Sequence, residues 1–293
     1  MTTERIPILL DTDIGTDIDD AVCLAYLLRQ PRCELVGITT VTGEPEQRAR
    51  LADAVCRAAG RADIPIHSGV AVPMLTESIQ STAAQAAVLD RFPHRTDFEP
   101  HTAVEFLRRT IRARPGEITL LAVGPLTNIG LLFAGDPEIP RLLNGLVLMC
   151  GLFDPRTSYG NLREWNAFGD PYATAIVYRA PVSPHVSFGL DVTTRCVLPA
   201  DACRRRLRGG PLDVVAAMAE VWFAHAGQIT FHDPLAAAGI FRPEICGYQD
   251  GTVEVELLSG RAPGITYWNP HAEAKPHRVA VTVHPEAFFE EYF

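Results

Sequence analysis

The sequence lacks any apolar run near the roughly 20 residues that a membrane-spanning helix needs. Its opening segment, MTTERIPILLDTD, holds a short apolar stretch that carboxylates follow at once, a pattern typical of a strand and not of a signal peptide. Lysine is almost missing as well, since Lys275 is the only one among 26 lysine and arginine residues. From these absences we expect a cytoplasmic protein with no membrane partner.

Cysteine is present but not in pairs that would indicate a linked framework. The seven cysteines are scattered along 293 residues and form no CxxC pair, which argues against disulfides and zinc knuckles. We therefore expect reduced, buried thiols. Acidic residues outnumber basic ones by 35 to 26, and the net charge of −9 argues against nucleic acid as the main partner.

The hydrophobic pattern predicts an α/β fold. Short runs rich in Ile, Val and Leu alternate with helical stretches of about a dozen residues, which is typical of βαβ units. Fully apolar strands indicate an open, mostly parallel, doubly wound sheet flanked by helices on both faces. The predicted strands are 6–11, 35–41, 64–67, 118–123, 146–150 and 186–190. The predicted helices are 19–29, 46–59, 103–113, 126–134 and 171–178. We expect one domain over residues 1–293.

The C-terminal third and one internal segment are less regular. Helices are predicted over 212–226 and 234–241, and strands over 252–258 and 279–283. Residues 68–101 contain three prolines and no clear period, which is typical of a functional loop or lid.

Five carboxylates crowd into ten residues directly after the first predicted strand. They are Asp11, Asp13, Asp17, Asp19 and Asp20. Like charges this close are costly unless a cation or a bound proton relieves them. Capping of the next helix accounts for one or two of them but not for five. Since oxygen-only donors favour hard cations, the segment predicts a Ca²⁺ or Mg²⁺ site and not a zinc site.

Polar residues also follow later strands, where ligands of open α/β sheets bind. Gly124-Pro125-Leu126-Thr127-Asn128 predicts a tight turn and a helix start. The loop 154–170 carries side chains suited to a polyol or a ring: Asn161, Glu164, Trp165 and Asn166. His232-Asp233 precedes a predicted helix, which fits a cap and a core histidine as well as a site.

Known motifs with closely spaced aspartates fit poorly. A haloacid-dehalogenase-like phosphatase needs a lysine and a late acidic pair, yet Lys275 stands near the C-terminus with no such pair after it. An EF-hand starting at Asp11 needs a glutamate where Val22 stands, and a helix where a strand is predicted. GxSxG, GxxxxGK[ST] and GxGxxG are absent, so serine hydrolases, P-loop proteins and dinucleotide binders lack support.

Taken in order, the motifs resemble the inosine–uridine-preferring nucleoside hydrolase family. Its opening signature, a strand followed by DTDxG…DDA, is matched at 11–15 and 19–21. The resemblance continues through residues 103–132, 147–153, 164–173, 189–193 and 232–236. It implies a nucleoside-hydrolase-like fold and Ca²⁺-dependent hydrolysis of the N-glycosidic bond of ribonucleosides, giving free base and ribose. It also implies a homodimer or homotetramer.

The resemblance further assigns roles to individual residues. The metal ligands would be Asp13, Asp20, the backbone carbonyl of Thr127, and Asp233, with Asp13 also acting as general base on a metal-bound water. The residues that bind ribose hydroxyls would be Asp19, Asn161, Glu164, Asn166 and Asp233. His232 would lie near the leaving base, with Trp165 and Phe231 as an apolar or stacking wall.

Three segments depart from the family pattern. The usual Asn after Gly43 is Glu44, a candidate acceptor for a ribose hydroxyl. The small-residue pair after the fifth strand is Cys150-Gly151, and the His-Gly-x-x-Gly-Leu segment that shapes the base pocket is missing from 68–101. Two alternatives therefore stay open: a hydrolase of a modified or non-standard N-ribosyl compound, and a catalytically silent ribose-binding member of the fold.

Overall fold

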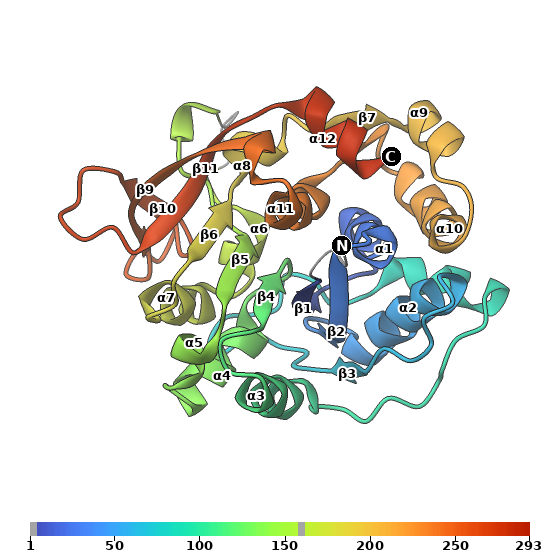
Figure 1. Cartoon of the computed structure of the whole chain (residues 1–293), viewed down its shortest axis with the longest axis horizontal. Coiled ribbons are helices and arrows are strands. Elements are labelled where there is room, and N and C mark those ends of the chain that lie inside the picture. Colours follow the sequence, from blue (N-terminus) through green and yellow to red (C-terminus); the bar gives the residue numbers. More distant parts are fainter. Residues whose placement is uncertain (1–4, 158–161) are drawn as a thin grey trace.

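The computed structural model describes residues 5–157 and 162–293. Within these residues, nine strands form one sheet in the order β10-β9-β11-β6-β5-β4-β1-β2-β3 (Figure 1). Their bounds are β1 (Ile6–Thr12), β2 (Cys33–Thr40), β3 (Ile66–Ser68), β4 (Thr119–Ala122), β5 (Gly145–Met149), β6 (His185–Phe188), β9 (Cys246–Val255), β10 (Thr266–Asn269) and β11 (His277–Val283). A separate antiparallel pair joins β7 (Val197–Pro199) to β8 (Gln228–Thr230).

The seven strands from β11 to β3 in this order run parallel to one another. Strand β9 is antiparallel to β10 on one side and to β11 on the other. The predicted open, mostly parallel sheet is therefore confirmed. Its order reverses at β1, because the chain continues to β2 on one side and returns to β4 on the other. Such a switch point leaves a crevice at the carboxyl ends of the strands.

Helices cover both faces of this sheet (Figure 1). They are α1 (Asp19–Arg29), α2 (Pro45–Ala58), α3 (Ala103–Ala113), α4 (Thr127–Gly135), α5 (Ile139–Leu142), α6 (Trp165–Gly169), α7 (Pro171–Arg179), α8 (Leu190–Thr193), α9 (Ala200–Arg206), α10 (Pro211–Phe223), α11 (His232–Phe241) and α12 (Pro285–Tyr292). Three 3₁₀ segments are η1 (Ala84–Arg91), η2 (Pro155–Thr157) and η3 (Pro243–Ile245).

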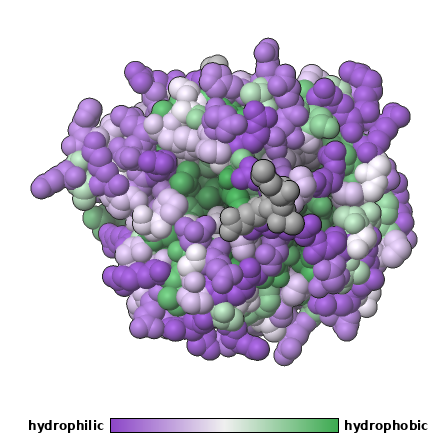
Figure 2. Space-filling model, in the orientation of Figure 1, coloured by the Kyte–Doolittle hydropathy of each residue, from purple (hydrophilic) through white to green (hydrophobic). Residues whose placement is uncertain are grey.

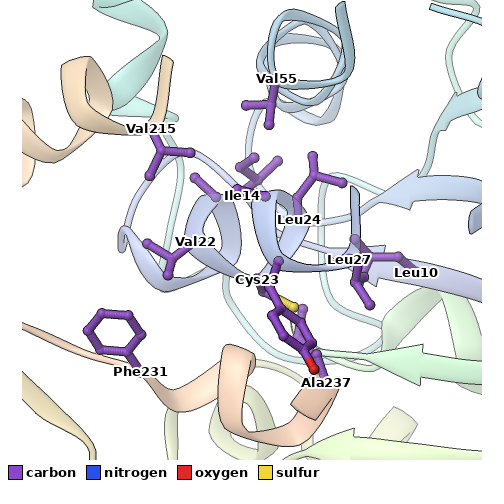
Figure 3. Close-up of a cluster of buried hydrophobic side chains, with 14 of the residues drawn as sticks. Leu10, Ile14, Val22, Cys23, Leu24, Leu27, Val55, Val215, Phe231 and Ala237 are labelled. Atoms are coloured by element: carbon purple, nitrogen blue, oxygen red, sulfur yellow. The ribbon is translucent and has the colours of Figure 1, made fainter. Parts of the chain in front are cut away.

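The core forms two buried clusters, one on each face of the sheet. Because side chains alternate along a strand, Ile8 and Leu10 of β1 enter the cluster with α1, α2, α10 and α11, whereas Leu9 enters the cluster with α3, α4 and α7. Figure 3 shows Val22, Cys23 and other α1 side chains surrounded by residues of α2, α10 and the chain before α11. A helix that is apolar around most of its circumference is fixed on all sides. The first turn of α1, which carries Asp19 and Asp20, is therefore held rigidly at the switch point.

All seven cysteines are buried and free, as expected from their spacing. Burial raises the pKa of each thiol above its ordinary value. They serve as small apolar residues of the core.

The predictions for the C-terminal third were wrong in several details. The helix predicted from Pro234 already begins at His232, and the strand predicted over 252–258 begins at Cys246 and ends at Val255. Helix α12 and strand β10 were missed. Strand β9 mixes buried, half-buried and exposed residues without regular alternation, and it is positioned by pairing with β10 and β11, so local apolar runs mark its ends poorly.

No helix in the described ranges has the length and apolar character to cross a bilayer. The face of the molecule seen in Figure 2 is mainly hydrophilic, with an apolar hollow near its middle.

Candidate active site

A cavity of about 330 Å³ lies at the carboxyl ends of β1, β4 and β5, where the strand order reverses. The chain brings residues from eight separate segments to it. Its lining consists of Asp13, Thr16, Asp17, Asp19, Asp20, Gln80, Val123, Met149, Glu164, Trp165, Asn166, Leu190, Trp222, His232 and Asp233. This is the position at which open α/β sheets bind ligands.

Four of the five clustered aspartates reach this cavity, and Asp11 does not. Asp11 is fully buried inside the sheet, where its Oδ1 accepts hydrogen bonds from Thr39 Oγ1 at 2.5 Å and Asn128 Nδ2 at 2.8 Å. Burial raises its pKa to about 7. Asp11 thus belongs to the scaffold beneath the site, and counting it with the other carboxylates overstated the cluster.

Three carboxylates of the cavity lie around one point. One oxygen from each of Asp19, Asp20 and Asp233 lies within 4.8 Å of the other two, and all three residues are buried. The backbone N–H of Asp233 donates to Asp19 Oδ2 at 3.3 Å, so the start of α11 meets the start of α1. Asp20 Oδ1 accepts from the Thr12 hydroxyl and from the backbone N–H of Asp13 at 3.2 Å.

Electrostatics favours a cation among these groups. Burial, followed by repulsion between the carboxylates, raises the pKa values of Asp19, Asp20 and Asp233 well above the ordinary range. Burial likewise raises the pKa of Asp13, and that of Asp17 to about 6. No ion pair found among the described residues reaches them. Arg48 offsets only part of the negative charge of Asp13 and Asp20, so a hard divalent cation, which suits an all-oxygen donor set, would neutralise the remainder.

The nearest buried cation, Arg48, does not fill that role. Its guanidinium is fully buried and donates to the backbone carbonyls of Asp13, Ile14 at 3.1 Å and Thr42 at 2.6 Å. Arg48 therefore fixes the backbone of the acidic loop while the carboxylates face the cavity. Sequence reasoning missed it, although a charged residue on the buried face of the predicted helix was an available signal.

The turn after β4 approaches the acidic loop closely. A Cβ on Gly124 would lie 2.8 Å from Asp13 Oδ1 and 2.9 Å from Asp13 N, so only glycine fits there. Thr127 is buried and is not among the residues that line the cavity, and its hydroxyl donates to Asp170 Oδ2 at 2.8 Å, at the start of α7. The role of its backbone carbonyl as a metal ligand stays a prediction. Val123, directly after β4, is the residue of this turn that lines the cavity.

The loop after β5 delivers Glu164 and Asn166 as predicted, both buried. Glu164 caps α6, since its carboxylate accepts from the backbone N–H groups of Asn166 at 2.6 Å, Ala167 at 2.9 Å and Gly151 at 2.9 Å. Asn166 Nδ2 donates to the carbonyls of Val123 at 2.7 Å and Met149 at 3.0 Å. These bonds link the ends of β4 and β5 and fix both side chains at the cavity.

Aromatic and apolar side chains form the remaining wall. Trp165 lines the cavity and is 49% exposed, and Trp222 of α10 joins it, which sequence reasoning missed. Phe231 was assigned to this wall wrongly: it is fully buried against the C-terminal helix, within 5.9 Å of the Phe288 ring centre. His232 does line the cavity, with Nδ1 2.7 Å from Thr193 Oγ1, and burial lowers its pKa to about 4.

Two further sequence-predicted residues are not among those that line the cavity. Glu44 lies outside it, and its exposed carboxylate accepts from the backbone N–H of Ala83 at 2.9 Å. Asn161 falls outside the described residues. In contrast, Gln80 from the irregular segment 68–101 lies in the cavity beside Asp13, and no local pattern in the sequence indicated it.

Comparison with known proteins agrees with this geometry. The family model described as "Inosine-uridine preferring nucleoside hydrolase" matches residues 8–290. The chain belongs to this family. A probable uridine nucleosidase 1 from Oryza sativa subsp. japonica is 29% identical, over 95% of this chain and 93% of its own length. A pyrimidine-specific ribonucleoside hydrolase, RihA, from Enterobacter sp. (strain 638) is 32% identical, over 89% of this chain and 87% of its own length.

Solved structures of nucleoside hydrolases share the fold. The purine-preferring ribonucleoside hydrolase from Gardnerella vaginalis has a TM-score of 0.83 and 26% identity, covering 98% of this chain and 96% of that chain. A plant nucleoside hydrolase, PpNRh1, has a TM-score of 0.82 at 24% identity and covers 98% of both chains. The predicted family, its nucleoside-hydrolase-like α/β fold and the enzyme class, a hydrolase of N-glycosyl bonds, are thereby confirmed.

Proposed function

We propose that this nucleoside hydrolase cleaves ribonucleosides to free base and ribose, with Ca²⁺ held by the acidic cluster. The observation that carries the proposal is the group of buried carboxylates at the switch point, beside a wall with two tryptophans. Asp13, Asp20 and Asp233 would hold the metal, with a backbone oxygen of the turn after β4 completing the set. When bound, Ca²⁺ orients the attacking water and lowers its pKa.

The chain's own carboxylates perform the remaining work at the sugar. Asp13 takes the proton from the attacking water as general base, because burial beside the other acids makes its carboxylate a stronger base than an exposed aspartate. Cleavage of the glycosidic bond passes through an oxocarbenium-like sugar. Negative and dipolar groups already fixed around the ribose stabilise that positive charge without reorganising. Asp19, Glu164 and Asn166 supply them and bind the hydroxyls.

The leaving base lies against the apolar wall and near His232. Trp165 and Trp222 provide stacking surface on which any nucleobase gains affinity. His232 is neutral near pH 7, since burial lowers its pKa to about 4. It therefore assists departure of the base as a hydrogen-bond donor and not as a charged acid. This requires the Thr193 hydroxyl to donate to Nδ1, leaving the proton on Nε2.

The reaction is tested by measuring reducing-sugar release from purine and pyrimidine ribonucleosides, with Ca²⁺ and after chelation. We expect turnover that chelation abolishes and that Asp13→Ala removes. Turnover that survives chelation would overturn the metal assignment, and full activity of Asp13→Ala would overturn the general base. If no common nucleoside is hydrolysed, modified N-ribosyl compounds are tried next. Saturable ribose binding without any turnover would instead indicate a binding protein.

Assembly and location belong to the same proposal. We propose that the whole chain, 1–293, acts as one catalytic domain within a cytoplasmic homodimer or homotetramer. Light scattering coupled to size-exclusion chromatography tests the assembly, and a monomer at micromolar concentration would contradict it.

A further inference from the structure

We propose that Gln80 is a positioning residue that orients the general base Asp13 and the aromatic wall at Trp165 together. The inference rests on the proposed function, because it concerns the two residues that would contact the water and the nucleobase. Gln80 is only 6% exposed and lies between them. Its Nε2 donates to Asp13 Oδ2 at 3.0 Å, and its Oε1 accepts from the Trp165 indole at 2.7 Å.

The chemistry of the amide permits only one orientation here. A carboxylate oxygen can only accept from the NH₂ end, and an indole N–H can only donate to the carbonyl end. A flipped amide would bring two acceptors together at Asp13 and two donors together at Trp165. The second proton of Nε2 is used as well, since it is donated to Thr16 Oγ1 at 2.7 Å. Every donor and acceptor of Gln80 that faces the site is thus committed, and the Asp13 carboxylate is held through Oδ2.

The segment around Gln80 is bound firmly to the acidic loop. The backbone N–H of Gln85 donates to the Gly15 carbonyl at 2.9 Å, and its side chain donates to the Thr16 carbonyl at 3.0 Å. The Thr16 hydroxyl donates to the Thr82 carbonyl at 3.0 Å. These bonds hold the backbone that follows Gln80, so Gln80 has little freedom to leave Asp13 when substrate enters.

Glu44 and Gly43 anchor the same segment from the other side. Glu44 accepts from the Ala83 N–H, and a Cβ on Gly43 would lie 2.9 Å from the Gln80 carbonyl oxygen. The family pattern has an amide side chain at position 44, whereas here the amide that faces Asp13 comes from Gln80. Position 44 instead holds the backbone segment that presents this amide.

The two ends of Gln80 should affect different kinetic constants. Loss of the hydrogen bond to Asp13 leaves the base free to rotate, which lowers kcat. Loss of the bond to Trp165 frees the indole against which the nucleobase binds, which raises KM. A residue with only a structural role would lower thermal stability without separating the two constants.

Methionine matches glutamine in length and flexibility but offers none of its hydrogen bonds, so Gln80→Met is the test variant. Trp165→Phe keeps an aromatic ring but removes the indole N–H together with part of the stacking surface. The double variant completes a cycle. Gln47→Met, the same substitution on the outer part of α2, is the matched control and should keep the kcat, KM and Tm of the wild type.

We expect Gln80→Met to lower kcat about 10- to 100-fold, as for loss of one charge-assisted hydrogen bond, and to raise KM a few-fold. Trp165→Phe should raise KM by a similar factor and lower kcat much less. The KM of the double variant should match that of Trp165→Phe, because Gln80→Met removes a bond to the indole that the phenylalanine variant already lacks. A kcat within twofold of wild type for Gln80→Met, or KM effects that multiply, would overturn the inference.

Tryptophan emission gives a readout that does not depend on turnover. Gln80→Met should shift the emission of the wild-type protein but not that of the Trp165→Phe variant. An equal shift in both backgrounds would refute the contact. If the wild type hydrolyses no nucleoside while this difference is seen, the proposed function fails and the positioning contact stands.

Discussion

Replacing Gly124 by alanine should displace the general base, and the size of the effect follows from the structure. The added Cβ would lie 2.8 Å from Asp13 Oδ1 and 2.9 Å from Asp13 N, against 3.4 Å for ordinary contact, so about half an ångström of movement is needed. The second obstacle is backbone and cannot rotate away. Misplacing a catalytic group by about 1 Å costs roughly 100-fold in rate, so we expect kcat to fall about 10- to 100-fold.

The assay is reducing-sugar release at saturating nucleoside and Ca²⁺, with thermal melting to confirm folding. Gly135→Ala is the matched control, because its Cβ would meet nothing within 4 Å and α4 ends there. We expect that variant to keep the wild-type kcat. If Gly124→Ala is folded and turns over within threefold of the wild type, the close approach of the β4 turn does not govern the position of Asp13.

Three further predictions concern stability, metal and base binding. His185 is buried with both ring nitrogens unpartnered, and burial lowers its pKa to about 3. Folding therefore favours the neutral ring. The contribution of the neutral ring to the free energy of unfolding is complete above pH 6.5 and is lost as the pH falls below that value. When the pH falls from 7.5 to 5, the free energy of unfolding measured with urea should therefore decrease by about 2 kcal/mol less for His185→Phe than for the wild type. Equal decreases in the two proteins would contradict this. Ca²⁺ should raise the Tm of the wild type by several degrees relative to the chelated protein. The Tm of the exposed control variant Asp97→Asn should rise equally, whereas the Tm of Asp20→Asn should not change with Ca²⁺. Trp222→Leu should raise KM roughly 10-fold while inhibition by ribose stays unchanged, since its ring borders the cavity on the apolar side; equal weakening of both would place Trp222 at the sugar instead.

The sequence predicted the acidic half of the site well because its members are close in the chain. Asp13, Asp19 and Asp20 follow one strand within a few residues, and strand ends of a parallel sheet meet at one edge. Asp233 was found through its family motif. The sheet itself was predictable because its inner strands are mostly apolar and buried, whereas the bounds of β9, in which buried and exposed residues are mixed, were misplaced.

What the sequence could not reveal depends on contacts between distant segments. Gln80 lies 67 positions from Asp13, in a stretch with no period, and only the folded chain brings them together. Asp11 shares the acidic motif but still belongs to β1, where it lies on the same face as Leu9, and Asn128 of the covering helix α4 donates to it, whereas Asp13 follows the end of the strand. Phe231 precedes a site residue directly, yet the C-terminal aromatic helix buries it.

The reactivity of the seven buried thiols can be used to measure local unfolding of the protein. They are spread over α1, β2, α2, the chain after β5, the turn before β7, α9 and β9, and none is exposed. A thiol reagent can modify such a cysteine only when its element opens, and the raised pKa slows the reaction further. Modification followed by mass spectrometry would rank these elements by the free energy of their opening, without introducing a label. A single cysteine placed on the surface would, in turn, react alone while the fold stays closed.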